Sequence, residues 1–272
     1  MIQINNLTKR YGQSEKLAVD NLTLTVNPGE IFGFLGPNGA GKSTTIKCVT
    51  GILPYSFGSI NVNGVNIADN PVAAKMNIGY VPDNHSTYEK LKGIEYLNFL
   101  ANIYNVDKDV RGERIDGLVK LLNMEEAIGS QIRTYSHGMK QKICVIGSLI
   151  HDPKVWILDE PLTGLDPRSA FNLKELMRKR ADEGKTVFFS SHILEVVERL
   201  CDRIGIISGG RLAAVGTVDD LKQNSSLEQF FLAITENNSQ GGSDVPGGGG
   251  IQSGGFDTFS AQGGHNADGG RR

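Results

Sequence analysis

The stretch Gly36-Pro-Asn-Gly-Ala-Gly-Lys-Ser-Thr44 decides how this chain must fold. It fits the pattern of a glycine, four free positions and then Gly-Lys-Ser, which is typical of a phosphate-binding loop. The apolar run Ile31 to Leu35 precedes it, and a helix is predicted over residues 43–50. An ordinary glycine-rich turn is the alternative interpretation. Strand, loop, lysine, hydroxyl and helix all occur in the required order, which favours the phosphate loop.

The residue types of this loop suit a triphosphate. Glycines at 36, 39 and 41 allow the backbone N–H groups to curl closely around phosphate oxygens. Lys42 would reach the β- and γ-phosphates, and the Ser43 hydroxyl would ligate Mg²⁺. The helix that follows directs the positive end of its dipole at the same anion. The predicted nucleotide-binding residues of the loop are Gly36, Pro37, Asn38, Gly39, Ala40, Gly41, Lys42, Ser43 and Thr44.

The composition limits which other functions and which cellular compartments are expected. The 272 residues are 39% hydrophobic and 21% charged, which is ordinary for a globular protein. The formal net charge of −2 provides no basic field for nucleic acid, so no nucleic-acid partner is expected. Three scattered cysteines without a Cys-x-x-Cys spacing argue against a disulfide framework and against a structural zinc site. A reducing compartment is therefore expected.

Neither a signal peptide nor a membrane-spanning run is predicted. The first ten residues alternate polar and apolar side chains, and no eighteen apolar residues follow one another. If the protein works at a membrane, we expect another polypeptide to span it.

The order of predicted elements is that of an α/β protein. The N-terminal strands alternate polar and apolar residues and predict an antiparallel sheet, residues 84–150 read as a helical insertion, and strands return at 155–158 and 186–190. We expect a mainly parallel sheet with helices on both sides. Three parts are predicted: a domain over 1–220, a helix over 221–236 and a disordered glycine-rich tail over 237–272.

A second motif carries two acids at the end of a strand. Four apolar residues, 155–158, precede Asp159 and Glu160, so both carboxylates lie at the carboxyl edge of the sheet, where ligands bind. Successive side chains point in opposite directions, and the two acids need not share a task. Asp159 suits the Mg²⁺ shell, and Glu160 could orient or deprotonate an attacking water. Acids that merely cap a strand end are the alternative.

Three further positions are ambiguous by themselves. Tyr11, in a turn between the first strands, could stack on a nucleobase or pack on its own hairpin. Ser136, ahead of a helix, could bind an anion together with nearby N–H groups or serve only as a helix cap. His192, at a strand end, could donate to a γ-phosphate or be a structural histidine.

Together these motifs resemble, over residues 1–220, the ATP-binding subunit of ATP-binding cassette (ABC) transporters. Residues 36–43 look like Walker A, 155–160 like Walker B and 164–166 like the D-loop. Tyr11 stands where the family stacks adenine, and His192 looks like the switch histidine. The resemblance implies ATP and Mg²⁺ as ligands, with Lys42, Glu160 and His192 as catalytic residues.

Two segments depart from the family pattern. Residues 135–139 occupy the place of the signature Leu-Ser-Gly-Gly-Gln but keep only Ser136 and Gly138 of it, both predicted to contact nucleotide. Asp83 stands where the family has the Q-loop glutamine, and it could still reach Mg²⁺ through water. Both departures are similar to the ABC-2 subgroup, which often exports antibiotics, peptides or polymers.

The resemblance also implies partners. In the family, two cassettes sandwich two ATP molecules, with Ser136, Gly138 and Asp166 of one chain facing the Walker residues of the other. Motion then passes to integral membrane permease subunits, whose coupling helix would dock near residues 83–96, so we expect the chain at the cytoplasmic face of the membrane. A soluble ABC-type ATPase in translation or DNA repair, and a nucleotide sensor with little turnover, remain as alternatives.

Overall fold

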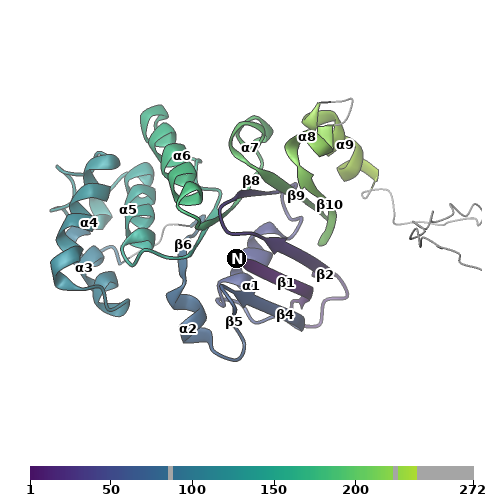
Figure 1. Ribbon diagram of the computed structural model, residues 1–272, viewed down its shortest axis with the longest axis horizontal. Coiled ribbons are helices and arrows are strands. Elements are labelled where there is room, and N and C mark those ends of the chain that lie inside the picture. The colour runs from purple at the N-terminus through teal and green to yellow at the C-terminus, as the bar shows by residue number, and fades with distance from the viewer. Residues whose placement is uncertain (85–87, 223–225, 238–272) are drawn as a thin grey trace, which may run out of the picture. The chain divides into compact units, whose positions relative to one another are not determined.

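A computed structural model describes residues 1–84, 88–222 and 226–237. The predicted α/β class is confirmed, with ten strands and nine α-helices within these residues (Figure 1). The strands are β1 Ile2–Arg10, β2 Leu17–Val26, β3 Ile31–Leu35, β4 Phe57–Val62, β5 Val65–Asn66, β6 Ile78–Val81, β7 Val155–Asp159, β8 Thr186–Ser191, β9 Arg203–Ser208 and β10 Arg211–Thr217. The α-helices are α1 Lys42–Val49, α2 Pro71–Met76, α3 Gly93–Ile103, α4 Lys108–Leu121, α5 His137–Leu149, α6 Pro167–Asp182, α7 Leu194–Leu200, α8 Val218–Lys222 and α9 Leu227–Asn237.

The strands form two sheets. A six-stranded sheet has the order β10-β9-β3-β8-β7-β6 and is parallel except for β10, while β2-β1-β4-β5 form an antiparallel sheet. The central strands β3, β7 and β8 are fully buried, as expected for a parallel sheet covered on both faces, and their polar side chains lie only at the ends of β7 and β8. Their register places Leu35 opposite Ser191 and Asp159 opposite Ser190, so the predicted motifs meet at one carboxyl edge.

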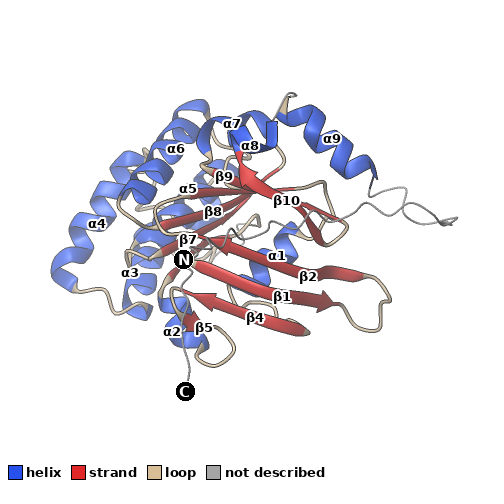
Figure 2. Ribbon diagram, turned by 45° about the vertical axis from the view of Figure 1, so that its right-hand side comes forward, coloured by secondary structure: helices blue, strands red, loops and turns tan. Residues whose placement is uncertain are grey.

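The two faces of the large sheet are covered differently. Helices α5, α6 and α7 pack on one face, in a core that includes Trp156 and Phe189. The opposite face, which includes Phe188, packs against α1, α2 and the antiparallel sheet (Figure 2). Helices therefore lie on both sides, as expected, but on the second side most of the cover is a sheet. The alternating residues of β1 and β2 supply that apolar face.

The prediction of a single helix over 221–236 is wrong. The chain forms α8 and α9 instead, and a capping box explains the new start at Leu227. The Ser226 hydroxyl accepts a hydrogen bond from the Gln229 N–H at 3.2 Å, and the Gln229 side chain accepts one from the Ser226 N–H at 3.4 Å. The predicted disordered tail lies outside the described residues after Asn237, which ends α9.

Candidate nucleotide-binding site

A cavity of about 230 Å³ lies in front of the phosphate loop. Three separate segments join the loop in its wall: β2 through Ala18, the segment after β6 through Asp83, and the end of β7 through Glu160. The full lining is Ala18, Pro37, Asn38, Gly39, Gly41, Lys42, Ser43, Thr44, Asp83 and Glu160. The structure thus brings together most of the residues that the sequence predicts for phosphate and metal, from positions far apart in the chain.

Two glycines of the loop are required by its shape. Gly41 has a φ of 112°, and a Cβ atom there would lie 2.5 Å from the Ala18 carbonyl oxygen. A Cβ atom at Gly36 would collide with the Ile207 carbonyl oxygen. Any side chain at either position would push the loop away from its neighbouring strands. The loop can therefore keep its close approach to β2 and β9 only with glycine at these two positions.

Lys42 is buried beneath the loop, with 7% of its surface exposed. Its Nζ atom donates hydrogen bonds to the Gly36 oxygen at 2.7 Å and the Pro37 oxygen at 3.3 Å, and lies 3.9 Å from a Glu160 carboxylate oxygen. Burial lowers the pKa of Lys42, while the charges of Glu160 and Asp159 oppose that shift. An ammonium group held in this way can exchange its carbonyl partners for phosphate oxygens.

Asp159 does not line the cavity itself, but it provides an unpaired carboxylate oxygen next to Ser43, which does. Its side chain is buried, and its Oδ1 atom accepts hydrogen bonds from the Ser43 hydroxyl at 3.2 Å and the Ser190 hydroxyl at 2.6 Å. The Oδ2 atom is buried without a hydrogen-bond partner in the described structure. A buried oxygen in this state requires an explanation, and a cation provides one. Mg²⁺ typically binds one or two carboxylates together with hydroxyl, phosphate and water oxygens, so Ser43 and Asp159 fit this ion.

Glu160 leaves the strand in a left-handed conformation, with a φ of 51°. Its N–H group donates to the Ser190 hydroxyl at 3.0 Å, and its Oε2 atom lies 3.0 Å from His192 Nδ1. The side chain is 16% exposed, whereas that of His192 is 55% exposed. The two adjacent acids therefore point to different partners, as their alternation predicts. Glu160 is oriented by an imidazole at the cavity wall, where a reacting water could be held.

Tyr11 lies beside the phosphate loop. Its hydroxyl is 3.2 Å from the Thr44 hydroxyl, and its ring is 5.3 Å from Lys9 Nζ. The side chain remains 47% exposed, so a large part of the ring is open to solvent. This position allows a planar base to stack on the ring next to the phosphates.

Ser136 and Gly138 lie elsewhere. Ser136 is exposed at the N-terminal end of α5, where its hydroxyl accepts a hydrogen bond from the Met139 N–H at 3.3 Å. Gly138 packs against the backbone of Gly164, whose carbonyl oxygen would be 2.8 Å from a Cβ at position 138. Neither residue lines the cavity of the phosphate loop. Within one chain these two predicted contacts are thus separate from the others.

Sequence reasoning missed the residues that support the site. Ser190 binds both acids, and its place opposite Asp159 in the neighbouring strand is the signal that could have revealed it. The fully buried Gln141 of α5 donates to the Pro161 carbonyl oxygen, just after Glu160. Lys142 Nζ lies 3.1 Å from Asp166, whose pKa is held below its usual range by hydrogen bonds from Ser169 and by this lysine.

Comparison with known proteins identifies the family. Residues 19–163 match the family described as ABC transporter, which covers more than half of the chain. The chain belongs to the ABC transporter family. The predicted resemblance is therefore confirmed, and the protein is an ATP-binding cassette with the ATPase activity of this family.

Individual ABC proteins are similar over most of the chain. The linearmycin resistance ATP-binding protein LnrL of Bacillus subtilis is 39% identical over 221 residues, which are 81% of this chain and 70% of the relative. The Nod factor export ATP-binding protein I of Cupriavidus metallidurans is 34% identical over 221 residues, 81% of this chain and 72% of the relative. A solved ATP-binding subunit of an ABC transporter is 32% identical with a TM-score of 0.82, covering 86% of this chain and 99% of that one.

Proposed function

We propose that this cassette hydrolyses ATP at a site that a second cassette completes, and that it drives export through separate integral membrane subunits. The proposal rests on the distance, within one chain, between the phosphate-loop cavity and the start of α5. Lys42, Ser43 and Glu160 line a cavity of suitable chemistry, whereas Ser136 and Gly138 lie at an exposed helix start outside it. If all five act on one ATP, two chains must supply them. The second cassette is another copy of this chain or a related one.

Each residue in and around the cavity has a separate role in phosphoryl transfer. Lys42 binds the β- and γ-phosphates, and Glu160 orients and deprotonates the attacking water. His192 holds Glu160 through Nδ1 and contacts the γ-phosphate. Mg²⁺, held by Ser43 and Asp159, neutralises charge on the phosphates when it is bound. Asp83 reaches the metal through water, and Tyr11 stacks on adenine.

The second chain closes the site from the opposite side. Its Ser136 hydroxyl and the first N–H groups of its α5 bind the γ-phosphate, as helix starts bind anions. The contacts of α5 with the loop after Glu160, through Gln141 and Lys142, link each signature segment to the acid of its own chain. ATP thereby joins the two chains, and hydrolysis releases them.

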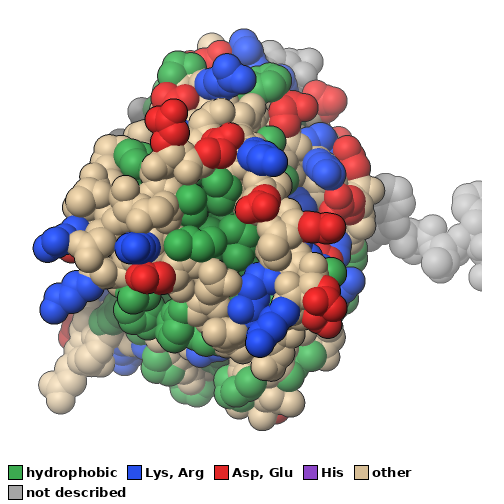
Figure 3. Space-filling model, turned by 90° about the vertical axis from the view of Figure 1, so that its left-hand side faces the viewer, with side chains coloured by type: hydrophobic (Ala, Val, Ile, Leu, Met, Phe, Trp, Pro, Cys, Tyr) green, Lys and Arg blue, Asp and Glu red, His purple; other side chains and the backbone are tan. Residues whose placement is uncertain are grey.

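The membrane subunits dock on a hydrophobic area near α3. Tyr88 is 59% exposed and Phe99 39% exposed, with their rings in an edge-to-face contact at 5.3 Å between centroids, and Ile103 lies on the same helix as Phe99. Hydrophobic side chains gather on the side of the molecule that carries α3 and α4 (Figure 3). No helix within residues 1–84, 88–222 and 226–237 is suited to cross a membrane. The resemblance to ABC transporter ATP-binding subunits favours a position at the cytoplasmic face, bound to subunits that span the membrane.

Export is favoured over import by two observations. The departures at Asp83 and residues 135–139 are similar to the ABC-2 subgroup, and a relative is named for Nod factor export. An antibiotic, a peptide or a polymer is the expected class of cargo.

The test is purification of the tagged protein from gently solubilised membranes, with wild type beside Glu160→Gln. We expect a multi-span membrane protein to co-purify with both, and ATP hydrolysis with wild type alone. Recovery of ribosomes or DNA-repair factors without a membrane chain would support the soluble ATPase. A hydrolysis rate that is negligible in wild type and unchanged by Glu160→Gln would support the nucleotide sensor.

A further inference from the structure

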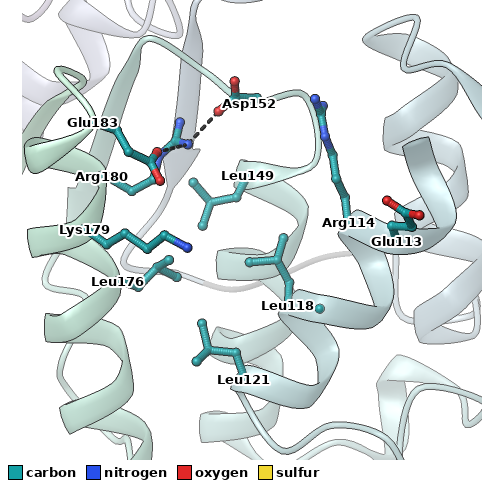
Figure 4. A pocket seen from close by; sticks show the side chains of 11 residues that line it. Glu113, Arg114, Leu118, Leu121, Leu149, Asp152, Leu176, Lys179, Arg180 and Glu183 are labelled. Carbon is teal, nitrogen blue, oxygen red and sulfur yellow. Dashed lines mark hydrogen bonds and ion pairs between the residues drawn. The ribbon is translucent and has the colours of Figure 1, made fainter.

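A second and larger cavity, of about 420 Å³, lies between α4, α5 and α6. It shares no lining residue with the cavity of the phosphate loop. Four leucines point into it from these three helices: Leu118 and Leu121 of α4, Leu149 of α5 and Leu176 of α6 (Figure 4). Leu149 and Leu176 are almost fully buried, whereas Leu121 is 36% exposed at the opening. The cavity therefore has an apolar floor and an entrance open to solvent.

The charged residues that line the cavity balance, three basic against three acidic, and Lys185 beside them adds one positive charge. Arg180 is neutralised by Asp152 at 2.5 Å and Glu183 at 3.2 Å, and Lys185 shares Asp152. Lys179 has no ion-pair partner in the part of the chain that the structure describes. Its amino group reaches toward the leucines, and the carboxylate of Glu113 lies away from them (Figure 4).

Two further donor groups face this region, one on Arg114 and one on Arg180, whose Nη1 atom already pairs with Asp152 and Glu183. Arg114 Nη1 donates to the Ile150 carbonyl oxygen at 3.0 Å, so its positive charge is not neutralised. The Nε atom of Arg180 is buried without a hydrogen-bond partner in the described structure. An apolar floor below a rim with unpaired donors and one excess positive charge matches an amphipathic anion of low charge.

We propose that the cavity between α4, α5 and α6 binds a single-chain fatty acid. Its alkyl chain packs on the four leucines, and its carboxylate lies at the rim near Lys179 and Arg114. The carboxylate carries one negative charge, in keeping with the small positive excess. The ligand contacts α4 and α6 at once, and it joins the helical segment 93–149 to the helix that follows the D-loop.

Calorimetric titration of the full chain with octanoate, decanoate and dodecanoate, below their micelle concentrations, tests this site. The affinity is expected to rise about fourfold for each CH₂ group that reaches the leucines. Decyltrimethylammonium, with the same chain and the opposite charge, is expected to bind more weakly than decanoate. Equal or tighter binding of the cation, or the absence of any decanoate binding, would overturn the proposal.

A pair of glycine substitutions on α4 locates the binding. Gly117 lines the cavity and Gly112 does not, and a Cβ atom at either would meet nothing within 4 Å. Both substitutions also raise helix propensity, so both variants are expected to fold. Gly117→Phe fills the cavity and should weaken decanoate binding at least about tenfold, which is the loss of about two CH₂ contacts. Gly112→Phe should bind as wild type does. Equal affinity of Gly117→Phe and wild type would contradict the assigned location.

A pair of lysines on α6 tests the charge. Lys179→Gln should weaken decanoate binding about two- to fivefold, and less at high salt, because Lys179 is exposed. Lys174→Gln changes the same helix outside the cavity and should have no effect. Equal losses in both variants would show that the lysine contributes only general charge, and would refute the assigned position of the carboxylate.

Discussion

The phosphate-loop cavity and the start of α5 differ in how much of a binding site one chain builds there. At the cavity, three segments direct a lysine, two carboxylates and a serine hydroxyl into one space. At the start of α5, Ser136 is exposed and its hydroxyl is engaged by its own helix. This difference supports the proposal that the phosphate-loop cavity recognises nucleotide by itself, and that the start of α5 acts on a nucleotide held by another chain.

The largest effect is expected for substitution of Lys42, which lies in the phosphate-loop cavity. Lys42→Met removes the buried ammonium group from the phosphates, and loss of one such charge stabiliser typically costs about 10²–10³-fold in rate. ATP binding to the isolated chain should weaken as well, since Lys42 lies in the cavity that one chain forms by itself. ATP turnover and equilibrium binding of a fluorescent ATP analogue measure the two effects.

Lys47→Met is the matched control, because Lys47 is an exposed lysine of the same helix α1. It should leave both quantities unchanged. Wild-type turnover in Lys42→Met would show that the phosphate loop is not required for ATP hydrolysis.

Ser136→Ala should act on turnover without acting on the isolated chain's affinity for ATP. Loss of a hydrogen bond to a charged phosphate is expected to lower turnover about 10- to 100-fold. Loss of the helix cap should also destabilise the fold by about 1 kcal/mol. Thermal unfolding, ATP binding and ATP turnover separate these contributions.

Asn70→Ala serves as the control for the cap alone. Asn70 caps α2 by accepting a hydrogen bond from the Ala73 N–H at 3.2 Å. Its removal should lower stability by a similar amount while turnover stays at the wild-type level. Similar turnover losses in both variants would show that Ser136 acts only as a helix cap.

A third effect, on ATP affinity, is expected at Tyr11, and its lower bound is the smallest of the three. Tyr11→Ala removes a stacking surface worth about 1–3 kcal/mol, so ATP affinity should fall about 5- to 150-fold. Tyr11→Phe keeps the ring and loses only the contact with Thr44, so it should bind ATP nearly as wild type does. Titration with ATP, and with inorganic triphosphate as the ligand without a base, measures the difference. A loss for triphosphate as large as that for ATP would show that Tyr11 shapes the loop and does not stack on the base.

Much of the fold and of the cavity could be predicted from sequence, because it depends on short-range patterns. The loop 36–44 and the acids 159–160 follow buried strands, and parallel pairing brings such strand ends to one edge. The antiparallel sheet was also predicted, but its position over one face of the core could not be inferred in the same way. Its packing against β3 and β8 depends on tertiary contacts that alternating residues alone do not specify.

The remaining features depend on contacts between distant segments. The Ser226 capping box was visible in the sequence but lay inside an amphipathic pattern, which led to the prediction of one helix where two form. Ser190 and Gln141 support the acids only because the fold places them beside residues 159–161. The leucines of α4, α5 and α6 have ordinary helical spacing, and the cavity that they line arises from how those helices pack.

The most direct test of the central claim is a mixing experiment with two variants of strongly reduced turnover, Lys42→Ala and Ser136→Ala. A mixed dimer has one site in which the Lys42 of one chain faces the Ser136 of the other, both intact. About half of randomly formed dimers are mixed, each with one of two sites restored, so the account predicts recovery of about a quarter of wild-type turnover, above the sum of the separate variants. Turnover that stays at that sum, while mixed dimers are shown to form, would contradict a site shared between two chains.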